Sequence, residues 1–152
     1  MDTKALTILL AEDDDGHAAL VRRNLQRARM GAEVVRFRDG REVIEYLARG
    51  FTSDGVRGPV ILLLDIRMPG MDGTEVLRRV KSDPVWRALP VYMLTTTDNP
   101  VEVERCFELG CNAYLTKPVS YEDFTAAIER LCAFLEVSLV PTRPTGSKHA
   151  SA

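Results

Sequence analysis

Carboxylate, hydroxyl and ammonium side chains follow four short apolar runs of this 152-residue sequence. Taken singly, such residues usually cap a helix, face water or satisfy a strand end. Gathered at one edge of a fold they are harder to explain as solvation, because crowded carboxylates need a positive counter-ion. A hard divalent cation and an ammonium group both supply one. The residues are Glu12, Asp13 and Asp14 after the first run, Asp65 after the third, Thr95, Thr96 and Thr97 after the fourth, and Lys117 with Pro118 after the fifth.

Five β-rich runs separated by helical patterns must position these residues. Three of the runs are almost continuously apolar, which is typical of parallel strands that are covered on both faces. Five β–α units predict a parallel sheet with helices on both sides and right-handed crossovers. In such a sheet the chemistry lies beyond the carboxyl ends of the strands. The expected strands are Leu6–Ala11, Val34–Phe37, Val60–Leu64, Val91–Leu94 and Ala113–Thr116.

Helix start and stop signals lie between the strands. Asp39 and Asp72 each precede a glutamate by three residues, as in a capping box. Asn99 precedes a proline at the first helical position, and Gly110 suits the end of the same helix. In the last helix, helical spacing predicts one buried stripe, which consists of Phe124, Ile128, Leu131 and Leu135.

Composition excludes several classes of function. The net charge is −2, from 20 basic and 22 acidic residues, so the chain has no electrostatic signature of a nucleic-acid or anionic-membrane partner. The longest apolar run, Val60–Leu64, is far too short to span a bilayer. Cys106, Cys111 and Cys132 form neither a CxxC pair nor an even set, which indicates free thiols in a reducing compartment. We therefore expect a single cytoplasmic domain.

At this point the sequence resembles the receiver domain of bacterial response regulators over about residues 5 to 135. The resemblance implies an α/β, flavodoxin-like, doubly wound (βα)5 fold with a five-stranded parallel sheet in the order 2-1-3-4-5. We expect the receiver domain over residues 5–140 and a flexible C-terminal tail over residues 141–152. Four separated motifs carry the resemblance in family order, namely Ile8–Asp14, Leu62–Gly73, Met93–Thr96 and Tyr114–Pro118.

The resemblance implies a site for phosphoryl transfer. Asp65 matches the nucleophile that accepts a phosphoryl group from a phosphohistidine of a sensor histidine kinase. Mg²⁺ is the implied cofactor, with Asp13, Asp65 and the backbone carbonyl of Arg67 as direct ligands and Glu12 acting through water or as a weaker ligand. Lys117 is expected to pair with Asp65 and then with a phosphoryl oxygen.

The resemblance also implies a switch. Thr95 matches the hydroxyl that bonds the phosphoryl oxygen and draws the fourth loop inward. Tyr114 matches an aromatic residue that changes rotamer on activation, although packing within a fifth strand accounts for it equally well. The bond between Lys117 and Pro118 is expected to be cis.

Residues close to these motifs have more ordinary expectations. Asp14 falls outside the acidic pair and is expected to cap the first helix. Thr97 and Arg67 border the site and are candidates for tuning hydrolysis. His17 and His149 are expected to have no part in it, because a lone histidine is usually a surface or helix residue.

We therefore expect a stand-alone response regulator, with no output domain, that signals through a protein contact. It would not be an enzyme beyond self-directed phosphoryl transfer and autodephosphorylation. A phosphorelay shuttle or phosphate sink remains open. The ending Phe134–Pro141 and the stretch Gly50–Pro59 resemble small regulators associated with phytochrome-type histidine kinases.

Three other classes remain as alternatives. An aspartyl phosphohydrolase usually needs a second aspartate two positions after the nucleophile, where this chain has Arg67. A flavodoxin-like ligand-binding domain is suggested by Thr95–Asp98, yet its phosphate loop would follow the first strand, where acids would repel phosphate. A degenerate receiver that signals without phosphate is disfavoured by intact Asp13, Asp65 and Lys117.

The last helix also suggests self-association. Phe134 and Val137 lie away from its buried stripe at about 100° per residue. Uncovered apolar surface favours a second copy of the chain, and symmetric dimers are the commonest closed assembly. We expect a homodimer through the last helix and the Leu135–Val140 extension, with the fourth helix and fifth strand included. The alternative is a tail that folds back on its own domain.

Overall fold

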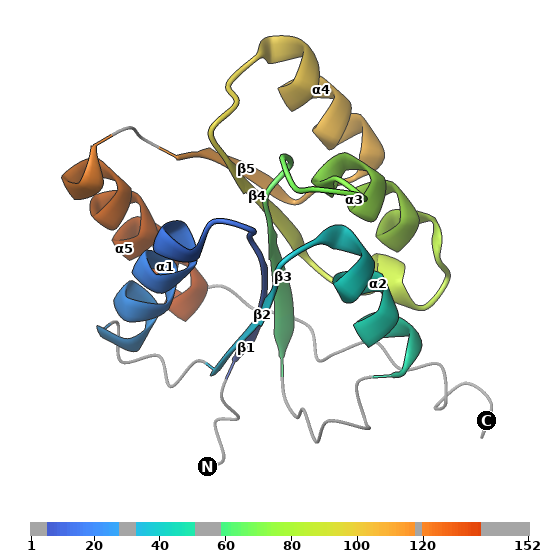
Figure 1. Ribbon diagram of the computed structural model, residues 1–152, viewed down its shortest axis with the longest axis horizontal. Helices are drawn as coiled ribbons and strands as arrows, with labels where there is room; N and C mark the ends of the chain where they lie inside the picture. The colour runs from blue at the N-terminus through green and yellow to red at the C-terminus, as the bar shows by residue number, and fades with distance from the viewer. Residues whose placement is uncertain (1–5, 28–32, 51–58, 118–119, 138–152) are drawn as a thin grey trace.

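Strands and helices alternate along the chain in the computed structural model, which describes residues 6–27, 33–50, 59–117 and 120–137 (Figure 1). A short 3-10 turn, η2, precedes the fourth strand. The order is β1 (Thr7–Ala11), α1 (Asp15–Arg27), β2 (Glu33–Phe37), α2 (Gly40–Ala48), β3 (Val60–Leu64), α3 (Gly73–Ser82), η2 (Trp86–Ala88), β4 (Val91–Thr95), α4 (Pro100–Leu109), β5 (Ala113–Thr116) and α5 (Tyr121–Val137).

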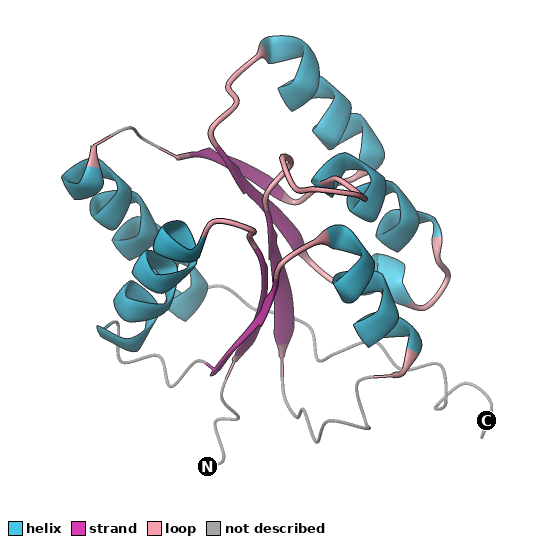
Figure 2. Ribbon diagram, viewed as in Figure 1, coloured by secondary structure: helices cyan, strands magenta, loops and turns pink. Residues whose placement is uncertain are grey.

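The strands form one parallel sheet in the order β2-β1-β3-β4-β5, which confirms the predicted topology. Helices α1 and α5 cover one face, and α2, α3 and α4 cover the other (Figure 1). The loops that follow the strands lie at one end of the sheet, the upper end in Figure 2. This arrangement brings the polar residues at the strand ends together.

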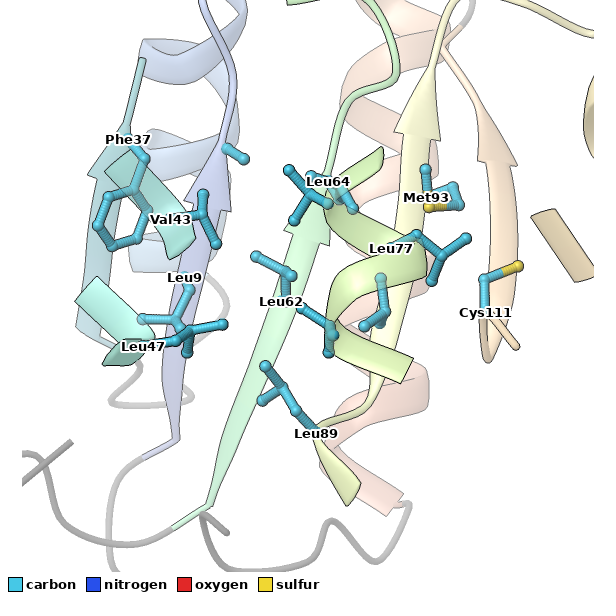
Figure 3. Close-up of a cluster of buried hydrophobic side chains, with 14 of the residues drawn as sticks. Leu9, Phe37, Val43, Leu47, Leu62, Leu64, Leu77, Leu89, Met93 and Cys111 are labelled. Atoms are coloured by element: carbon cyan, nitrogen blue, oxygen red, sulfur yellow. The ribbon is translucent and has the colours of Figure 1, made fainter. Parts of the chain in front are cut away.

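Each central strand supplies side chains to both faces of the sheet. Leu9, Leu62 and Met93 pack with α2, α3 and α4 (Figure 3). Their neighbours Ile8 and Ile61 pack with α1 and α5 instead. All five residues of β1, of β3 and of β4 are buried, because helices cover both faces. Two apolar layers therefore hold the ends of these strands in place.

Strand boundaries differ slightly from the sequence prediction. β1 starts at Thr7 and β2 at Glu33, each one residue from the expected start. β4 continues through Thr95, so this threonine is the last strand residue and not the first loop residue. Its backbone carbonyl accepts a hydrogen bond from the amide of Lys117 at 2.7 Å. This bond extends the pairing of β4 with β5.

The predicted helix caps are only half formed as capping boxes. Asp39 and Asp72 accept hydrogen bonds from the amides of Glu42 and Glu75 at 2.9 and 3.0 Å. The second bond of a capping box, in which the glutamate side chain accepts from the amide of the cap residue, is absent among the described contacts of Glu42 and Glu75. Glu42 accepts instead from the amide of Arg38, and Glu75 is drawn outward by arginines of its own helix. The predicted caps of α4 are confirmed, since the Asn99 side chain accepts from the amide of the second helical residue and Gly110 has a φ of 108°.

The last helix buries most of its predicted stripe. Phe124, Ile128 and Leu131 are buried, whereas the side chain of Leu135 and residues 138–152 lie outside the described part. The expected domain end and tail therefore stay predictions. Cys106 and Cys111 are buried free thiols. Within the described ranges, no helix is long and apolar enough to cross a bilayer.

Candidate functional site

Parallel pairing places two acidic residues side by side at the end of the sheet. Ala11 of β1 is in register with Leu64 of β3, so the residues that follow them are neighbours. The amide of Asp65 donates to the Ala11 carbonyl at 3.0 Å, and the amide of Glu12 donates to the Phe37 carbonyl at 3.0 Å. The strand ladders thus continue one step and fix the backbone of both acids.

Three carboxylates come together at this point. Glu12, Asp13 and Asp65 each offer an oxygen, and these oxygens lie within 4.8 Å of one another. Glu12 and Asp65 are buried, and Asp13 is exposed. A set of hard oxygen donors with one side open to water fits a divalent cation such as Mg²⁺ or Mn²⁺. The amide of Arg67 lies 3.4 Å from Asp65 Oδ1, while its backbone carbonyl remains a predicted ligand only.

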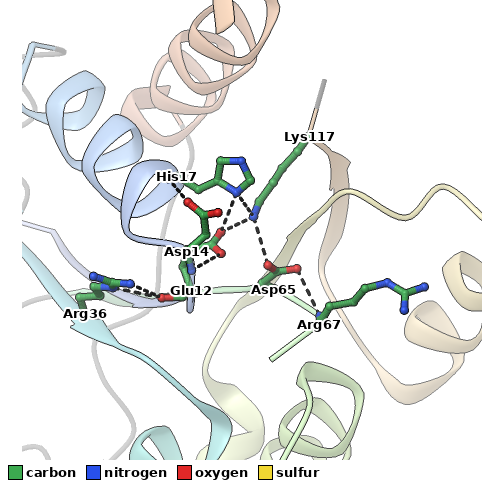
Figure 4. A network of polar contacts seen from close by, with 7 residues as sticks. All are labelled: Glu12, Asp14, His17, Arg36, Asp65, Arg67 and Lys117. Atoms are coloured by element: carbon green, nitrogen blue, oxygen red, sulfur yellow. Dashed lines mark hydrogen bonds and ion pairs between the residues drawn. The ribbon is translucent and has the colours of Figure 1, made fainter. Parts of the chain in front are cut away.

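The ammonium of Lys117 lies between the strand ends and is almost fully buried, with 1% of its side chain exposed. It pairs with the carboxylate of Glu12 and with Asp65 Oδ2 at 3.1 Å (Figure 4). His17 Nδ1 lies at 3.2 Å as a third partner. An ammonium has three N–H donors, so the described contacts use all of them. The structure therefore brings the expected lysine to Asp65 and adds two partners to it.

Burial dominates the ionisation of Glu12. Loss of hydration raises the pKa of its carboxyl from 4.5 to about 7, although the adjacent Lys117 ammonium lowers the pKa. Repulsion from Asp65 adds to the rise. In the absence of a metal ion, this carboxyl therefore holds a proton at a higher pH than an ordinary glutamate does. A cation bound in the cluster favours the ionised form.

The prediction that His17 has no part in the site is wrong. Its ring reaches Lys117 through Nδ1 (Figure 4). The same nitrogen lies 3.9 Å from the carboxylate of Glu12. The ring also packs edge-on against Phe124 of α5, with 5.6 Å between the ring centroids. The first turn of α1 sets this position, since the His17 amide donates to Asp14 Oδ1 at 2.9 Å. Asp14 thus caps α1 as predicted, and His149 lies outside the described residues.

The other side of Asp65, toward α4, carries the remaining predicted residues. Thr95 is fully buried, and its Oγ1 has no hydrogen-bond partner among the described residues. Thr97 Oγ1 donates to Glu102 at 2.8 Å, and Tyr114 Oη donates to the Thr97 carbonyl at 2.7 Å. The Arg67 guanidinium lies 3.8 Å from Glu102.

Tyr114 is half-buried against the α2–α4 side of the core, and burial raises the pKa of its phenol to about 12. The Tyr114 hydroxyl is therefore neutral at physiological pH and holds the loop after β4 through its bond to the Thr97 carbonyl. Thr96 is exposed. The expected cis peptide at Pro118 lies outside the described residues.

Sequence reasoning missed a second residue, Arg36 of β2. Its guanidinium donates to the backbone carbonyl of Glu12 from Nε at 3.0 Å and from Nη2 at 2.9 Å (Figure 4). Its Nη1 donates to Asp15 Oδ1 at 2.7 Å. The only sequence signal is a charged residue inside a short β-rich run, which is not specific.

Comparison with known proteins agrees with this geometry. The family model described as the response regulator receiver domain matches residues 8–129. A solved receiver domain from Rhodospirillum rubrum is 41% identical, covers 91% of this chain and 99% of its own, and has a TM-score of 0.83. Response regulator Rcp1 from Synechocystis is 33% identical over 135 residues, which are 88% of this chain and 92% of Rcp1.

Two solved structures carry further information in their descriptions. The Mn²⁺-bound form of Rcp1 has a TM-score of 0.81 at 31% identity and covers 89% of this chain and 98% of its own. The phosphorylated cyanobacterial phytochrome response regulator RcpA has a TM-score of 0.83 at 31% identity, with 90% and 99% covered. Matches of this length and identity establish that the chain belongs to the response regulator receiver domain family.

Proposed function

We propose that this chain is a two-component response regulator that accepts a phosphoryl group on Asp65 from a sensor histidine kinase. The observation that carries the proposal is the place of Asp65, a buried carboxylate at the end of β3 with Lys117 on one side and the acidic cluster around it. A carboxylate held there is poised as a nucleophile beside a fixed positive charge.

The proposed reaction moves one phosphoryl group. An oxygen of Asp65 forms a bond to phosphorus while the P–N bond to the kinase imidazole breaks, and the imidazole keeps the electron pair. The product is an acyl phosphate on Asp65. Lys117 holds a phosphoryl oxygen and offsets its negative charge, since its ammonium already lies 3.1 Å from Asp65. This activity is a self-directed transfer, followed by autodephosphorylation, and not turnover of a separate substrate.

Mg²⁺ is the cation that we propose for the acidic cluster. Asp13, Asp65 and the Arg67 backbone carbonyl would hold it directly, with Glu12 through water. When bound, the ion neutralises charge on the phosphoryl oxygens. The hard oxygen donors and their open side support this assignment, and Mn²⁺ is bound by the relative Rcp1.

We further propose that Thr95 and Tyr114 form the switch. The buried hydroxyl of Thr95 lacks a partner in the described residues, and a phosphoryl oxygen on Asp65 would provide one. Movement of Thr95 toward Asp65 would carry the loop after β4, to which the Tyr114 hydroxyl is bonded. The face of α4, β5 and α5 would then change and alter a protein contact.

Radiolabel transfer tests the phosphoacceptor. Wild-type protein, Asp65→Asn and Asp14→Asn are incubated with acetyl phosphate or an autophosphorylated histidine kinase in Mg²⁺. Asp65→Asn is expected to lose labelling, and Asp14→Asn is expected to keep it, because asparagine still caps α1. Undiminished labelling of Asp65→Asn would contradict the proposal.

The partner that we propose is a phytochrome-type histidine kinase. The support is similarity to RcpA, described as a phytochrome response regulator, over 90% of this chain. Label transfer from phosphorylated phytochrome-type kinases is expected to be faster than transfer from unrelated histidine kinases at equal concentration. Equal rates from both groups would count against this partner.

A homodimer through α5 is the assembly that we propose. Phe134 of α5 keeps 53% of its surface exposed while its ring packs edge-on against Tyr92. Val101 and Phe107 of α4, on the opposite face of the sheet, are also exposed apolar residues, and a second copy that covers them would reach across the edge strand β5 (Figure 1). The solution mass of wild type at tens of micromolar is compared with that of Phe134→Asp, Val137→Asp. A monomeric wild type, with or without phosphorylation, would rule the dimer out.

A further inference from the structure

Arg36 connects β2 to the turn that carries the acidic cluster. It is in register with Leu10 of β1, two residues before Glu12. Its side chain is only 16% exposed. Its planar guanidinium donates three N–H bonds to this turn and to Asp15, the helix residue that follows it. Two of them converge on one acceptor, the backbone carbonyl of Glu12.

This carbonyl belongs to the peptide group that joins Glu12 to Asp13. A bond from two donors fixes both the position and the plane of that peptide, and hence the direction in which Asp13 leaves the strand. Residues 12–14 are neither strand nor helix, and Asp13 itself is exposed. The turn therefore depends on side chains for its shape, with Asp14 fixing its far end and Arg36 its near end.

Arg38, the residue after the end of β2, provides a comparison with Arg36. Its guanidinium reaches the same oxygen of Asp15 at 3.0 Å, yet it is 65% exposed and has no bond to Glu12 among the described contacts. An exposed ion pair of this kind contributes little. Arg36 differs from Arg38 because it also binds the carbonyl of the peptide that joins Glu12 to Asp13.

We propose that Arg36 is a positioning residue that sets the affinity of the acidic cluster for its divalent cation. The inference rests on the proposed metal role of Glu12, Asp13 and Asp65. The geometric role and the charge of Arg36 predict opposite changes in cation affinity when its side chain is removed. Loss of a nearby positive charge would strengthen cation binding, whereas loss of the fixed peptide would weaken it. We expect the geometric effect to dominate, because the carbonyl of this peptide has no other hydrogen-bond donor among the described contacts.

The test measures binding of Mn²⁺ from the loss of the free-ion EPR signal, followed by competition with Mg²⁺. The proteins are wild type, Arg36→Met, Arg36→Lys and Arg38→Met. We expect both Arg36 variants to bind about tenfold more weakly. Arg38→Met, which removes the same charge, is expected to stay within about twofold of wild type. Thermal unfolding of the metal-free proteins checks that each variant is folded, and Arg36→Lys keeps the charge if Arg36→Met does not fold.

Labelling by acetyl phosphate separates positioning from general damage. In the Arg36 variants the Mg²⁺ concentration for half-maximal rate is expected to rise about tenfold, with an unchanged rate at saturation. Wild-type affinity in the folded Arg36 variants, or tighter binding in Arg36→Met, would overturn the inference and leave the proposed function intact. Absence of metal binding by the wild type would instead overturn the proposed function and this inference with it.

Discussion

The two sides of Asp65 differ in how their polar groups are satisfied. Toward α1, the Lys117 ammonium has three partners, and two guanidinium donors bind the Glu12 carbonyl. Toward α4, the Thr95 hydroxyl is buried without a partner in the described residues, and Thr97 is turned to Glu102. The polar groups toward α1 are satisfied by hydrogen bonds, whereas the Thr95 hydroxyl toward α4 is left without one in the described part of the chain.

This difference indicates which part of the site is assembled before phosphorylation. A saturated network is rigid, and rigidity suits the groups that must hold charge and geometry during transfer. A buried hydroxyl without a partner costs free energy, and a ligand that bonds it recovers that cost. We therefore expect changes on the α1 side to alter transfer and metal binding, and changes on the α4 side to alter the response.

The largest expected effect is on the α1 side. Asp13→Ala removes one proposed metal ligand of the acidic cluster and leaves the buried pair of Glu12 and Asp65 in place. Mg²⁺ affinity is expected to fall by about a hundredfold or more, because even residues that support a ligand cost about 10–100-fold. Labelling by acetyl phosphate should fall with it and should stop in excess chelator. Asp98→Ala removes an exposed acid on the other side and should bind normally. Full labelling in chelator would exclude the metal role.

The next effect is a pH dependence that belongs to Glu12. Its pKa in the metal-free protein is about 7, above the ordinary 4.5, so it is ionised at pH 8 and about nine-tenths protonated at pH 6. Mg²⁺ affinity is therefore expected to fall by about tenfold between these values, since the ion requires the ionised cluster. Glu12→Gln should bind weakly with little dependence on pH. The same pH slope in both proteins would assign the effect to another group.

The raised pKa of Glu12 also makes the stability of the metal-free protein depend on pH. Burial penalises ionised Glu12, so its contribution to the metal-free fold becomes more favourable as pH falls from about 7 to 4.5. Saturating Mg²⁺ should remove that trend. Urea unfolding at several pH values, with and without Mg²⁺, measures both.

A smaller effect concerns the third partner of Lys117. His17→Phe keeps a ring against Phe124 and removes the acceptor, whereas His17→Asn keeps an acceptor at the place of Nδ1. We expect labelling of the phenylalanine variant to slow about fivefold, the value of one hydrogen bond of about 1 kcal/mol. The asparagine variant should stay close to wild type. Slowing of the asparagine variant alone would show that the ring, and not the acceptor, matters.

The sequence predicts best what depends on position along a strand. Glu12 and Asp65 follow buried strands and Lys117 follows the half-buried edge strand β5, and parallel topology alone brings such ends together. Contacts that cross between elements are harder to foresee. Arg36 reaches the turn after β1 from β2, and its role depends on strand register.

His17 is a second case of this kind. It meets Lys117 only because α1 begins at Asp15 and packs beside α5. The capping boxes formed only in part for a different reason. The side chains of Glu42 and Glu75 bond to local partners, which are the amide of Arg38 for Glu42 and two arginines of the same helix for Glu75.

The smallest expected effect concerns the unpartnered hydroxyl of Thr95 on the α4 side. Thr95→Val replaces the unpartnered hydroxyl with a methyl group of similar shape in a fully buried position. The unphosphorylated protein should gain about 1 kcal/mol in its free energy of unfolding in urea, because a buried group without a bond is removed. Thr97→Val is the matched control. It loses the 2.8 Å bond to Glu102 and should not gain stability. Thr95→Val should still accept phosphate on Asp65, yet phosphorylation should shift its partner affinity less than in wild type. A loss of stability equal to that of Thr97→Val would show that the Thr95 hydroxyl is bonded before phosphorylation, and the two sides of Asp65 would then not differ.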